Sequence, residues 1–222
     1  MISFLQINVG VCRSSQDLMV HTARECGADV VLVSEQYRNA DEETGWYSDT
    51  SGRSAVFVSS NIAVDVVGPL DIGFRWVQIN GIRIYSVYYS PNATIAEYNL
   101  FLSRLENSVR SADGPVLVAG DFNAKRPEWG SPTTDLRGNA LADLASSLNL
   151  HVCNDGNLPT FTRGASESFI DVTFVSQSLR QKVSNWRILD EDSLSLHWYI
   201  AFHITQTDHA TPLPPPTGWC WR

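Results

Sequence analysis

The sequence predicts an α/β protein in which two mostly antiparallel sheets pack face to face and helices cover their outer sides. Many strand-like apolar runs follow one another in meander-like groups with few helical segments between them, which does not fit a regular alternation of strand and helix. The 222 residues are 43% apolar and 18% charged. These proportions provide a core of real size and exclude a disordered or disulfide-stapled chain.

Short apolar runs separated by Gly and Asn residues predict the strands. They occupy residues 2–8, 30–34, 54–59, 63–67, 75–80, 83–89, 116–119, 150–153, 170–175, 183–189 and 198–204. Helical periodicity predicts a helix over 14–26, one over 94–111 that begins with a capping box of Thr94 and Glu97, and one over roughly 141–148.

The net charge of −8, taken alone, argues against a nucleic-acid partner, because phosphate binding rests on Lys and Arg. The acidic excess lies at the two ends, however. Residues 1–50 carry 3 basic and 8 acidic side chains (−5), residues 189–222 carry 1 and 4 (−3), and residues 51–188 carry 12 of each. The charge therefore leaves a polyanionic partner open.

The four cysteines form no C-x-x-C pair, so a reducing, intracellular setting is expected rather than a zinc site or a disulfide framework. The first apolar run lacks a basic leader, which argues against a signal peptide, and no run reaches the roughly 20 residues of a membrane span. We expect one domain over residues 1–205 and a Pro-rich linker over 206–222 that leads toward a further region.

Polar side chains stand at the ends of several predicted strands, where functional groups often collect. They are Asn8, Glu35, Tyr89, Asp121, Asn123, Asp171 and His197. Taken singly, most have a structural explanation, since an Asp or Asn after a strand is usually a turn or cap residue. Asp171 is harder to explain in this way, because a carboxylate inside an apolar strand must find a partner.

Together these side chains form a chemically coherent set. Carboxylate and amide oxygens suit Mg²⁺ or Mn²⁺, and a carboxylate beside a histidine fixes its tautomer and orientation. Asp, Asn and His can position and activate a water molecule, and a tyrosine can donate to an anionic oxygen. The set indicates metal-assisted hydrolysis of a phosphodiester.

The order of these motifs resembles the endonuclease/exonuclease/phosphatase superfamily. Six motifs follow the family order between residues 3 and 204: QIN at 6–8, SE at 34–35, YSPN at 89–92, GDFN at 120–123, ID at 170–171 and SLH at 195–197. The resemblance implies a four-layered α/β sandwich of the DNase I-like kind.

A second group of motifs is similar to the apurinic-endonuclease-like domain of non-LTR retrotransposons, with details like those of insect elements that insert into ribosomal RNA genes. The motifs are GDFNAK at 120–125, WGS at 129–131 and DLRG at 135–138. The resemblance implies a Mg²⁺-dependent endonuclease that nicks double-stranded DNA in the nucleus, at a specific site in ribosomal DNA, and leaves a 3′-hydroxyl that primes reverse transcription. The implied partners are the target DNA and the reverse transcriptase of the same polyprotein, with no membrane.

Carried over position by position, the resemblance implies that Glu35 is the principal metal ligand, with Asn8 beside it. Asp121, helped by Asn123, orients or deprotonates the attacking water.

On the phosphate side, the resemblance implies that His197 contacts the scissile phosphate or the water, that Asp171 holds His197, and that Tyr89 hydrogen-bonds a phosphate oxygen. One position departs from the family pattern, which usually has Asp immediately before the histidine, where this chain has Leu196. Leucine cannot ligate a metal, so weaker metal binding or slower cleavage is expected.

Loops at the rim of the site are the expected source of target choice. They are residues 39–47, 92–96, 125–134 and 160–168, and the candidate DNA contacts are Asn92, Lys125, Arg126, Trp129, Arg137 and Arg163. The alternative is that the arginines pair with acidic side chains.

Two other functions remain open. A phosphodiesterase or phosphatase of the same superfamily, acting on sphingomyelin or phosphoinositides, would use the same catalytic residues, although the WGS motif favours a nuclease. Leu196 motivates the other alternative, a catalytically weak module that targets DNA.

Overall fold

In the computed structural model, the described residues are 1–37, 44–155 and 158–205. The predicted linker over 206–222 lies outside the described residues, and so do residues 38–43, which include part of the expected rim loop at 39–47. No helix in the described part of the chain is long and apolar enough to cross a membrane.

The first sheet has six strands in the order β13-β14-β1-β2-β4-β3. The parallel pair β1–β2 lies at its centre, and the other neighbours run antiparallel. The strands are β1 (Ile2–Asn8), β2 (Val30–Ser34), β3 (Trp46–Ser48), β4 (Ser54–Val58), β13 (Val183–Ile188) and β14 (Ile200–Ile204).

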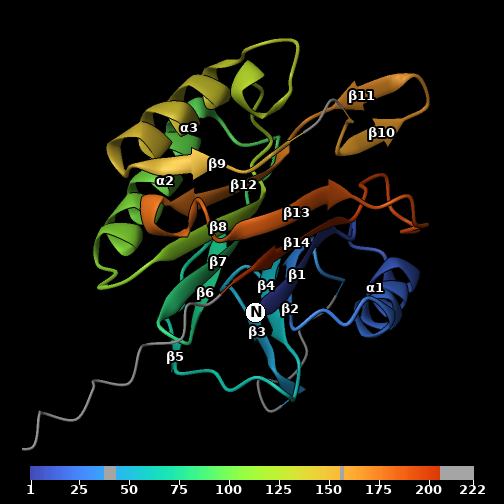
Figure 1. The fold of residues 1–222 in the computed structure, drawn as a ribbon. Helices are drawn as coiled ribbons and strands as arrows, with labels where there is room; N and C mark the ends of the chain where they lie inside the picture. Colours follow the sequence, from blue (N-terminus) through green and yellow to red (C-terminus); the bar gives the residue numbers. More distant parts are fainter. Residues whose placement is uncertain (38–43, 156–157, 206–222) are drawn as a thin grey trace, which may run out of the picture.

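The second sheet also has six strands, in the order β5-β6-β7-β8-β12-β9, and its parallel pair is β7–β8. The strands are β5 (Val66–Val67), β6 (Phe74–Ile79), β7 (Ile82–Tyr88), β8 (Val116–Asp121), β9 (Leu150–Val152) and β12 (Asp171–Ser176). A separate hairpin of β10 (Phe161–Arg163) and β11 (Ser166–Ser168) stands apart from both sheets (Figure 1).

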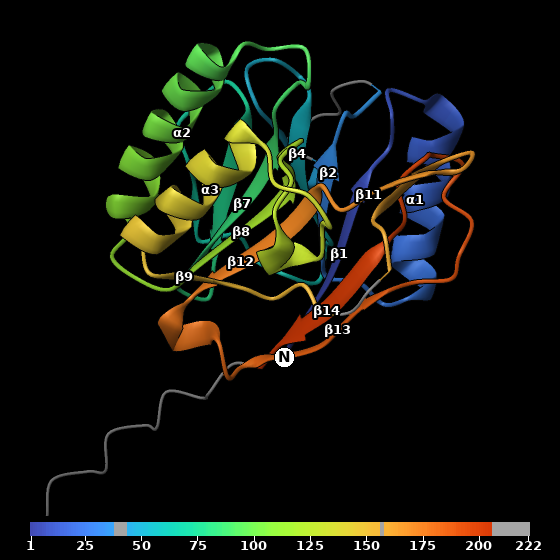
Figure 2. The same ribbon diagram turned by 90° about the horizontal axis from the view of Figure 1, so that it is seen from above.

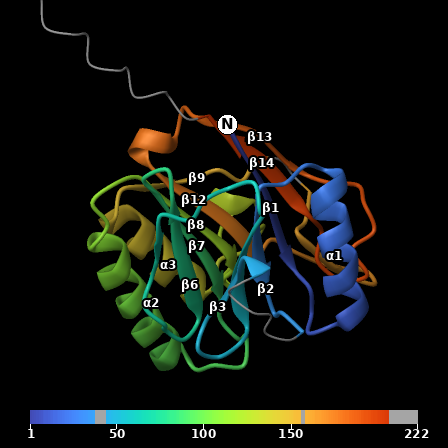
Figure 3. The ribbon, with the colours of Figure 1, turned by 90° about the horizontal axis from the view of Figure 1, so that it is seen from below.

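Within the described residues, three helices complete the four layers: α1 (Arg13–Glu25), α2 (Ile95–Arg110) and α3 (Leu136–Ser147), with short 3₁₀ turns η2 (Pro127–Trp129) and η3 (Gln177–Leu179). One apolar cluster fills the space between the two sheets. A second cluster joins the second sheet to α2 and α3, and a third joins the first sheet to α1. Figures 2 and 3 show α1 on one outer side and α2 with α3 on the other. The predicted sandwich is confirmed.

The second helix forms where its sequence predicts it. Thr94 is the N-cap, its hydroxyl accepts from the Glu97 backbone N–H, and the Glu97 carboxylate accepts from the Thr94 N–H at 2.7 Å. This capping box satisfies two backbone donors at the start of the helix. The apolar face that the sequence predicts, including Tyr98, Phe101 and Leu105, is buried against the second sheet.

The strand directions gather the candidate residues at one end of the sandwich. β1 and β2 end side by side with Asn8 opposite Ser34, and in the other sheet Tyr88 and Asp171 both lie opposite Asp121. Since β12 runs antiparallel to β8, the first residue of one strand meets the last residue of the other. The two parallel pairs therefore bring distant parts of the sequence to a common edge.

Candidate active site

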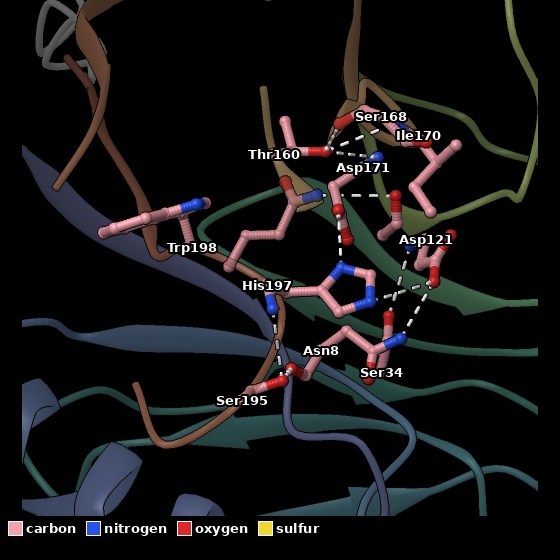
Figure 4. A network of polar contacts seen from close by, with 12 residues as sticks. Asn8, Ser34, Asp121, Thr160, Ser168, Ile170, Asp171, Ser195, His197 and Trp198 are labelled. Atoms are coloured by element: carbon pink, nitrogen blue, oxygen red, sulfur yellow. Dashed lines mark hydrogen bonds and ion pairs between the residues drawn. The ribbon is translucent and has the colours of Figure 1, made fainter. Parts of the chain in front are cut away.

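A buried histidine lies between two buried aspartates at this edge. The Nδ1 of His197 lies 2.8 Å from Oδ2 of Asp171, and its Nε2 lies 3.9 Å from Oδ2 of Asp121. All three side chains are less than a tenth exposed. Figure 4 shows the imidazole between the two carboxylates, with the side chain of Asn8 next to the ring and directed at the same oxygen of Asp121. The contact to Asp171 fixes the ring so that Nε2 faces Asp121.

The three groups shift one another's ionisation. Burial opposes the positive charge of His197, but the neighbouring carboxylates of Asp171 and Asp121 outweigh it and raise the pKa of the imidazole to about 9. Burial, together with the charge of Asp171, raises the pKa of Asp121 to about 7. At neutral pH the site therefore contains a protonated imidazole beside a carboxylate that can take up a proton.

Asp121 is held by partners from both sheets. Its Oδ2 accepts from Nδ2 of Asn8 at 2.8 Å, and its backbone N–H donates to Oγ of Ser34 at 3.2 Å. Its Oδ1 accepts from the backbone N–H of Asn123 at 2.9 Å. Asn123 adopts a left-handed backbone conformation, with φ of +48°, which costs free energy in a non-glycine residue. The carboxylate is thus oriented before any substrate arrives.

The residue directly before this aspartate, Gly120, has to be a glycine. Its φ is +149°, and a Cβ there would overlap the carbonyl oxygen of Val87 on the adjacent strand. Only glycine lets β8 approach β7 this closely at the point where both strands enter the site.

The turn before the histidine is also fixed by hydrogen bonds. The hydroxyl of Ser195 donates to the carbonyl of Asn8 at 2.7 Å, and that of Ser193 donates to the carbonyl of His197 at 2.6 Å. From the other side, the ring of Phe161 packs edge-on against the imidazole, with centroids 4.9 Å apart. These contacts join β1, the hairpin and the start of β14 around one side chain.

Glu35 stands at the rim of the buried group and is held by a tyrosine. The hydroxyl of Tyr88 donates to its Oε1 at 2.6 Å. Burial and the nearby Glu35 carboxylate raise the pKa of this hydroxyl, so it remains a donor. Glu35 has φ of +49°, a second left-handed residue beside the buried aspartates. Its charge contributes to the raised pKa of His197, which places it within electrostatic reach of the cluster.

The structure points Tyr88, and not the expected Tyr89, into the site. The hydroxyl of Tyr89 donates to the carbonyl of Glu97 at 3.1 Å, and its ring stacks on Phe101 at 4.4 Å. Tyr88 is the last residue of β7 and lies opposite Asp121, whereas Tyr89 follows the strand. The sequence has two tyrosines in succession, and the motif alone does not determine which of them faces the site. That depends on how the strand pairs with its neighbour.

The donor set suits a hard divalent cation. Ligand atoms of Asp121, Asp171 and His197 all lie within 4.8 Å of one another, but the imidazole is hydrogen-bonded to Asp171 and faces Asp121. The carboxylates best placed for a cation are therefore those of Asp121 and of Glu35, which adds a partly exposed carboxylate at the rim. The expected ligand Asn8 has its Oδ1 within 2.8 Å of the backbone N–H of Gly10, and an amide oxygen retains a second lone pair. Oxygen-rich sites of this kind fit Mg²⁺ or Mn²⁺.

Leu196 lies at the same rim. Its side chain is 48% exposed, and its carbonyl accepts from the backbone N–H of Thr162 in the hairpin at 2.8 Å. The residue that replaces the family's usual aspartate is therefore on the surface, outside the buried group of aspartates and histidine.

The expected DNA contacts divide into exposed and buried side chains. Asn92 and Arg163 are exposed and Lys125 is partly exposed, which keeps them available. Arg126 is engaged by Glu128 at 2.7 Å and by the side-chain oxygen of Asn139 at 2.7 Å.

Trp129 and Arg137 do not fit the expected contact with DNA. Trp129 is 2% exposed and its Nε1 donates to the carbonyl of Ala124 at 3.0 Å. Arg137 is 9% exposed and donates to the carbonyls of Pro91 and Ala93. Both side chains are covered by the protein, so in this conformation neither can reach a nucleic acid.

Sequence reasoning missed the hydroxyl groups that support the site. Besides Tyr88, these include Thr160, whose Oγ1 accepts from the backbone N–H groups of Ile170 and Asp171, both at 3.2 Å. Single Ser and Thr residues are common in loops, so nothing in the sequence distinguishes the few that hydrogen-bond the backbone next to a carboxylate of the candidate site.

The fold and the site together define a nuclease or phosphodiesterase of the endonuclease/exonuclease/phosphatase superfamily. A sequence profile described as endonuclease-reverse transcriptase matches residues 82–201. This match spans more than half of the chain, and the protein belongs to that family. A search of curated proteins gave no match.

Solved structures support the same assignment. The chain is similar to the endonuclease domain of TRAS1, a telomere-specific non-LTR retrotransposon, with a TM-score of 0.77 and 26% identity over 93% of this chain and 99% of that one. It also shares its fold with an AP endonuclease from Archaeoglobus fulgidus (TM-score 0.71, 16% identity, 92% and 99% coverage). A 3′ phosphatase, NExo, from Neisseria has the same fold (TM-score 0.71, 16% identity, 93% and 100% coverage). The predicted resemblance to a retrotransposon endonuclease is confirmed.

Proposed function

We propose that this protein is a Mg²⁺-dependent DNA endonuclease that nicks one strand of a duplex and leaves a 3′-hydroxyl and a 5′-phosphate. The buried Asp171–His197–Asp121 arrangement is the observation that carries the proposal, because it pairs a protonated imidazole with a carboxylate able to accept a proton. Membership of the endonuclease-reverse transcriptase family supports DNA as the substrate.

The proposed reaction is hydrolysis at phosphorus. Asp121 orients a water molecule and accepts its proton as the water oxygen bonds to phosphorus, and the bond from phosphorus to O3′ breaks while O3′ takes up a proton from the solvent. His197, whose Nδ1 is held by Asp171, donates one hydrogen bond from Nε2 to a phosphate oxygen as negative charge develops on it. Tyr88 holds Glu35 in its orientation at the rim.

A divalent cation would be held by Glu35 and Asn8, next to the carboxylate of Asp121. When bound, it would neutralise charge on a phosphate oxygen. Asn123 has a supporting part in the proposal. Its backbone N–H fixes the Asp121 carboxylate, and its side chain donates to the carbonyl of Tyr89 at 3.1 Å.

The experiment is nicking of supercoiled plasmid by the purified chain with Mg²⁺ and with EDTA. We expect nicking that EDTA abolishes and that His197→Ala and Glu35→Ala reduce at least about 100-fold. His21→Ala is the matched control, since His21 is 65% exposed on α1 and pairs with Glu25. Equal nicking by wild type and His197→Ala would refute the proposal, and DNA binding without cleavage at any Mg²⁺ or Mn²⁺ concentration would favour the targeting module.

The end group and the substrate class need separate measurements. Direct extension of the nick by a DNA polymerase would establish the 3′-hydroxyl that target-primed reverse transcription requires. Release of a headgroup from sphingomyelin or phosphoinositide vesicles, with no plasmid nicking, would instead favour the lipid-directed alternative.

For the target, we propose a site in ribosomal DNA, cut in the nucleus by a polyprotein that also carries the reverse transcriptase. The proposal rests on the resemblance of the sequence motifs to insect elements of that kind. Nick positions mapped on a ribosomal DNA fragment, on telomeric repeats and on random plasmid test it. One dominant position in ribosomal DNA would support it, whereas preferential cleavage of telomeric repeats would place the target with that of TRAS1.

A further inference from the structure

The start of α3 lies between two loops that carry candidate site residues. One is the turn after β7, residues 89–93, which holds Asn92. The other follows β8 over residues 122–125, directly after Asp121, which is the last residue of that strand. α3 starts within the DLRG motif at 135–138, to which the buried histidine cluster gives no role.

Asp135 holds the loop after β8 in place through hydrogen bonds. Its Oδ1 accepts from the backbone N–H of Lys125 at 3.1 Å and, as the N-cap, from that of Gly138 at 2.6 Å. The backbone N–H of Asp135 donates in return to the carbonyl of Lys125 at 3.1 Å. A Cβ at Gly138 would overlap that carbonyl, so a glycine is required for the loop and the helix to meet.

Arg137 holds the turn after β7 in place through hydrogen bonds. Its Nη2 donates to the carbonyls of Ala93 at 2.6 Å and Pro91 at 3.2 Å, the two neighbours of Asn92. Its guanidinium lies 4.8 Å from the centre of the Tyr98 ring, and Nη1 is buried as well. The cation is thus committed to the protein's own backbone.

We propose that residues 135–138 form a bracket that positions Asn92 for DNA binding, a role that rests on the proposed endonuclease function. Asp135 and Gly138 join the bracket to the loop of the catalytic aspartate, and Arg137 joins it to the turn of Asn92. Arg137 is therefore a positioning residue that acts on DNA through Asn92. This assignment gives three of the four residues of the motif, Asp135, Arg137 and Gly138, a part in the bracket.

The first test uses Arg137→Met, which removes the donors and retains much of the buried volume. In single-turnover nicking, we expect the DNA concentration for half-maximal cleavage to rise about tenfold, because a charged hydrogen-bonded anchor of the turn is lost. The maximal rate should fall less than about threefold. Arg110→Met is the matched control, since Arg110 pairs with Glu106 on the surface of α2. No change in the half-maximal concentration for Arg137→Met would overturn the proposal.

A double-mutant cycle with Asn92→Ala separates positioning from general destabilisation. If Arg137 acts through Asn92, Arg137→Met changes the half-maximal DNA concentration less than about twofold in the Asn92→Ala background. Two losses that multiply would overturn the proposal. Should Arg137→Met fail to fold, Arg137→Lys enters the same cycle, because lysine keeps the charge and loses the two-pronged geometry.

Amide hydrogen exchange tests the bracket without any cleavage. We expect Arg137→Met to speed exchange at least about fivefold in the peptide over 89–94 and to leave β6 unchanged. Unchanged exchange over 89–94 would overturn the bracket itself. Faster exchange there in a protein whose wild type does not nick DNA would instead leave the bracket standing and refute the endonuclease function.

Discussion

Replacing Tyr88 by phenylalanine tests which of two adjacent tyrosines serves the site. The change removes one hydroxyl group that donates to Glu35 at 2.6 Å and leaves the ring, which is 8% exposed, in place. Because the pKa of this hydroxyl is raised by burial, it stays protonated over the working pH range, and the variant loses a donor at every pH used.

The size of the effect follows from the type of hydrogen bond. A hydrogen bond to a charged group contributes about 1.5–3 kcal/mol. If Glu35 depends on this donor in the transition state, losing it slows cleavage by about 10- to 150-fold. Tyr89→Phe is the matched control. Its hydroxyl bonds a helix carbonyl in an exposed position and its ring can still stack on Phe101, so we expect a change of less than about twofold.

The assay is single-turnover nicking of supercoiled plasmid with enzyme in excess, with thermal melting followed by circular dichroism to confirm that both variants fold. A greater loss of rate in Tyr89→Phe than in Tyr88→Phe would refute the reasoning. It would show that the conformation seen here differs from the one that binds phosphate.

Three further predictions follow from single positions. Leu196→Asp adds a carboxylate beside His197, so the Mg²⁺ concentration for half-maximal nicking should fall about three- to tenfold in a metal titration; an unchanged midpoint would contradict this. Gly120→Ala places a Cβ against the carbonyl of Val87 and should lower the free energy of unfolding by at least about 3 kcal/mol in urea denaturation. Among the cysteines in the described part of the chain (Cys12, Cys26 and Cys153), iodoacetamide near neutral pH should alkylate Cys12 first, because a serine hydroxyl lowers its pKa and enlarges the thiolate fraction. Cys153 should react last, because burial raises its pKa to about 12; peptide mass spectrometry gives the order.

Most of the fold could be predicted because its elements carry their own local signals. The capping box and apolar face of 94–111 predicted α2 within one residue at each end. The short elements could not be found in this way. β3 owes its existence to pairing with β4, in which Trp46 lies opposite Phe57, and the β10–β11 hairpin has three residues in each strand. Strands of that length have no periodicity to detect, so the sequence predicted loops there.

The candidate site shows the same division. Asp171 could be recognised because a carboxylate inside an apolar strand needs a partner, and Asp121 and His197 because they belong to a set of motifs in the order of the superfamily. The structure brings all three together. The charge of Arg137 was a misleading signal, since a cation that binds backbone carbonyls inside the protein looks, in the sequence, like one that binds phosphate. Trp129 was likewise predicted to contact DNA, although its side chain is buried. Exposure separates the two cases, and exposure depends on which loops meet above the side chain.

The position of Leu196 predicts the effect of having leucine where the family usually has aspartate. The proton-handling groups are buried and fixed by partners on β1, β8 and β12, and none of these contacts passes through the side chain of Leu196. That side chain stands half exposed at the rim, while its backbone carbonyl keeps its bond to the hairpin. A missing carboxylate at such a place removes negative charge from the mouth of the site and leaves the imidazole and its aspartates where they are. Leucine in place of aspartate at position 196 should therefore raise the metal concentration that cleavage requires, while cleavage at saturating metal persists.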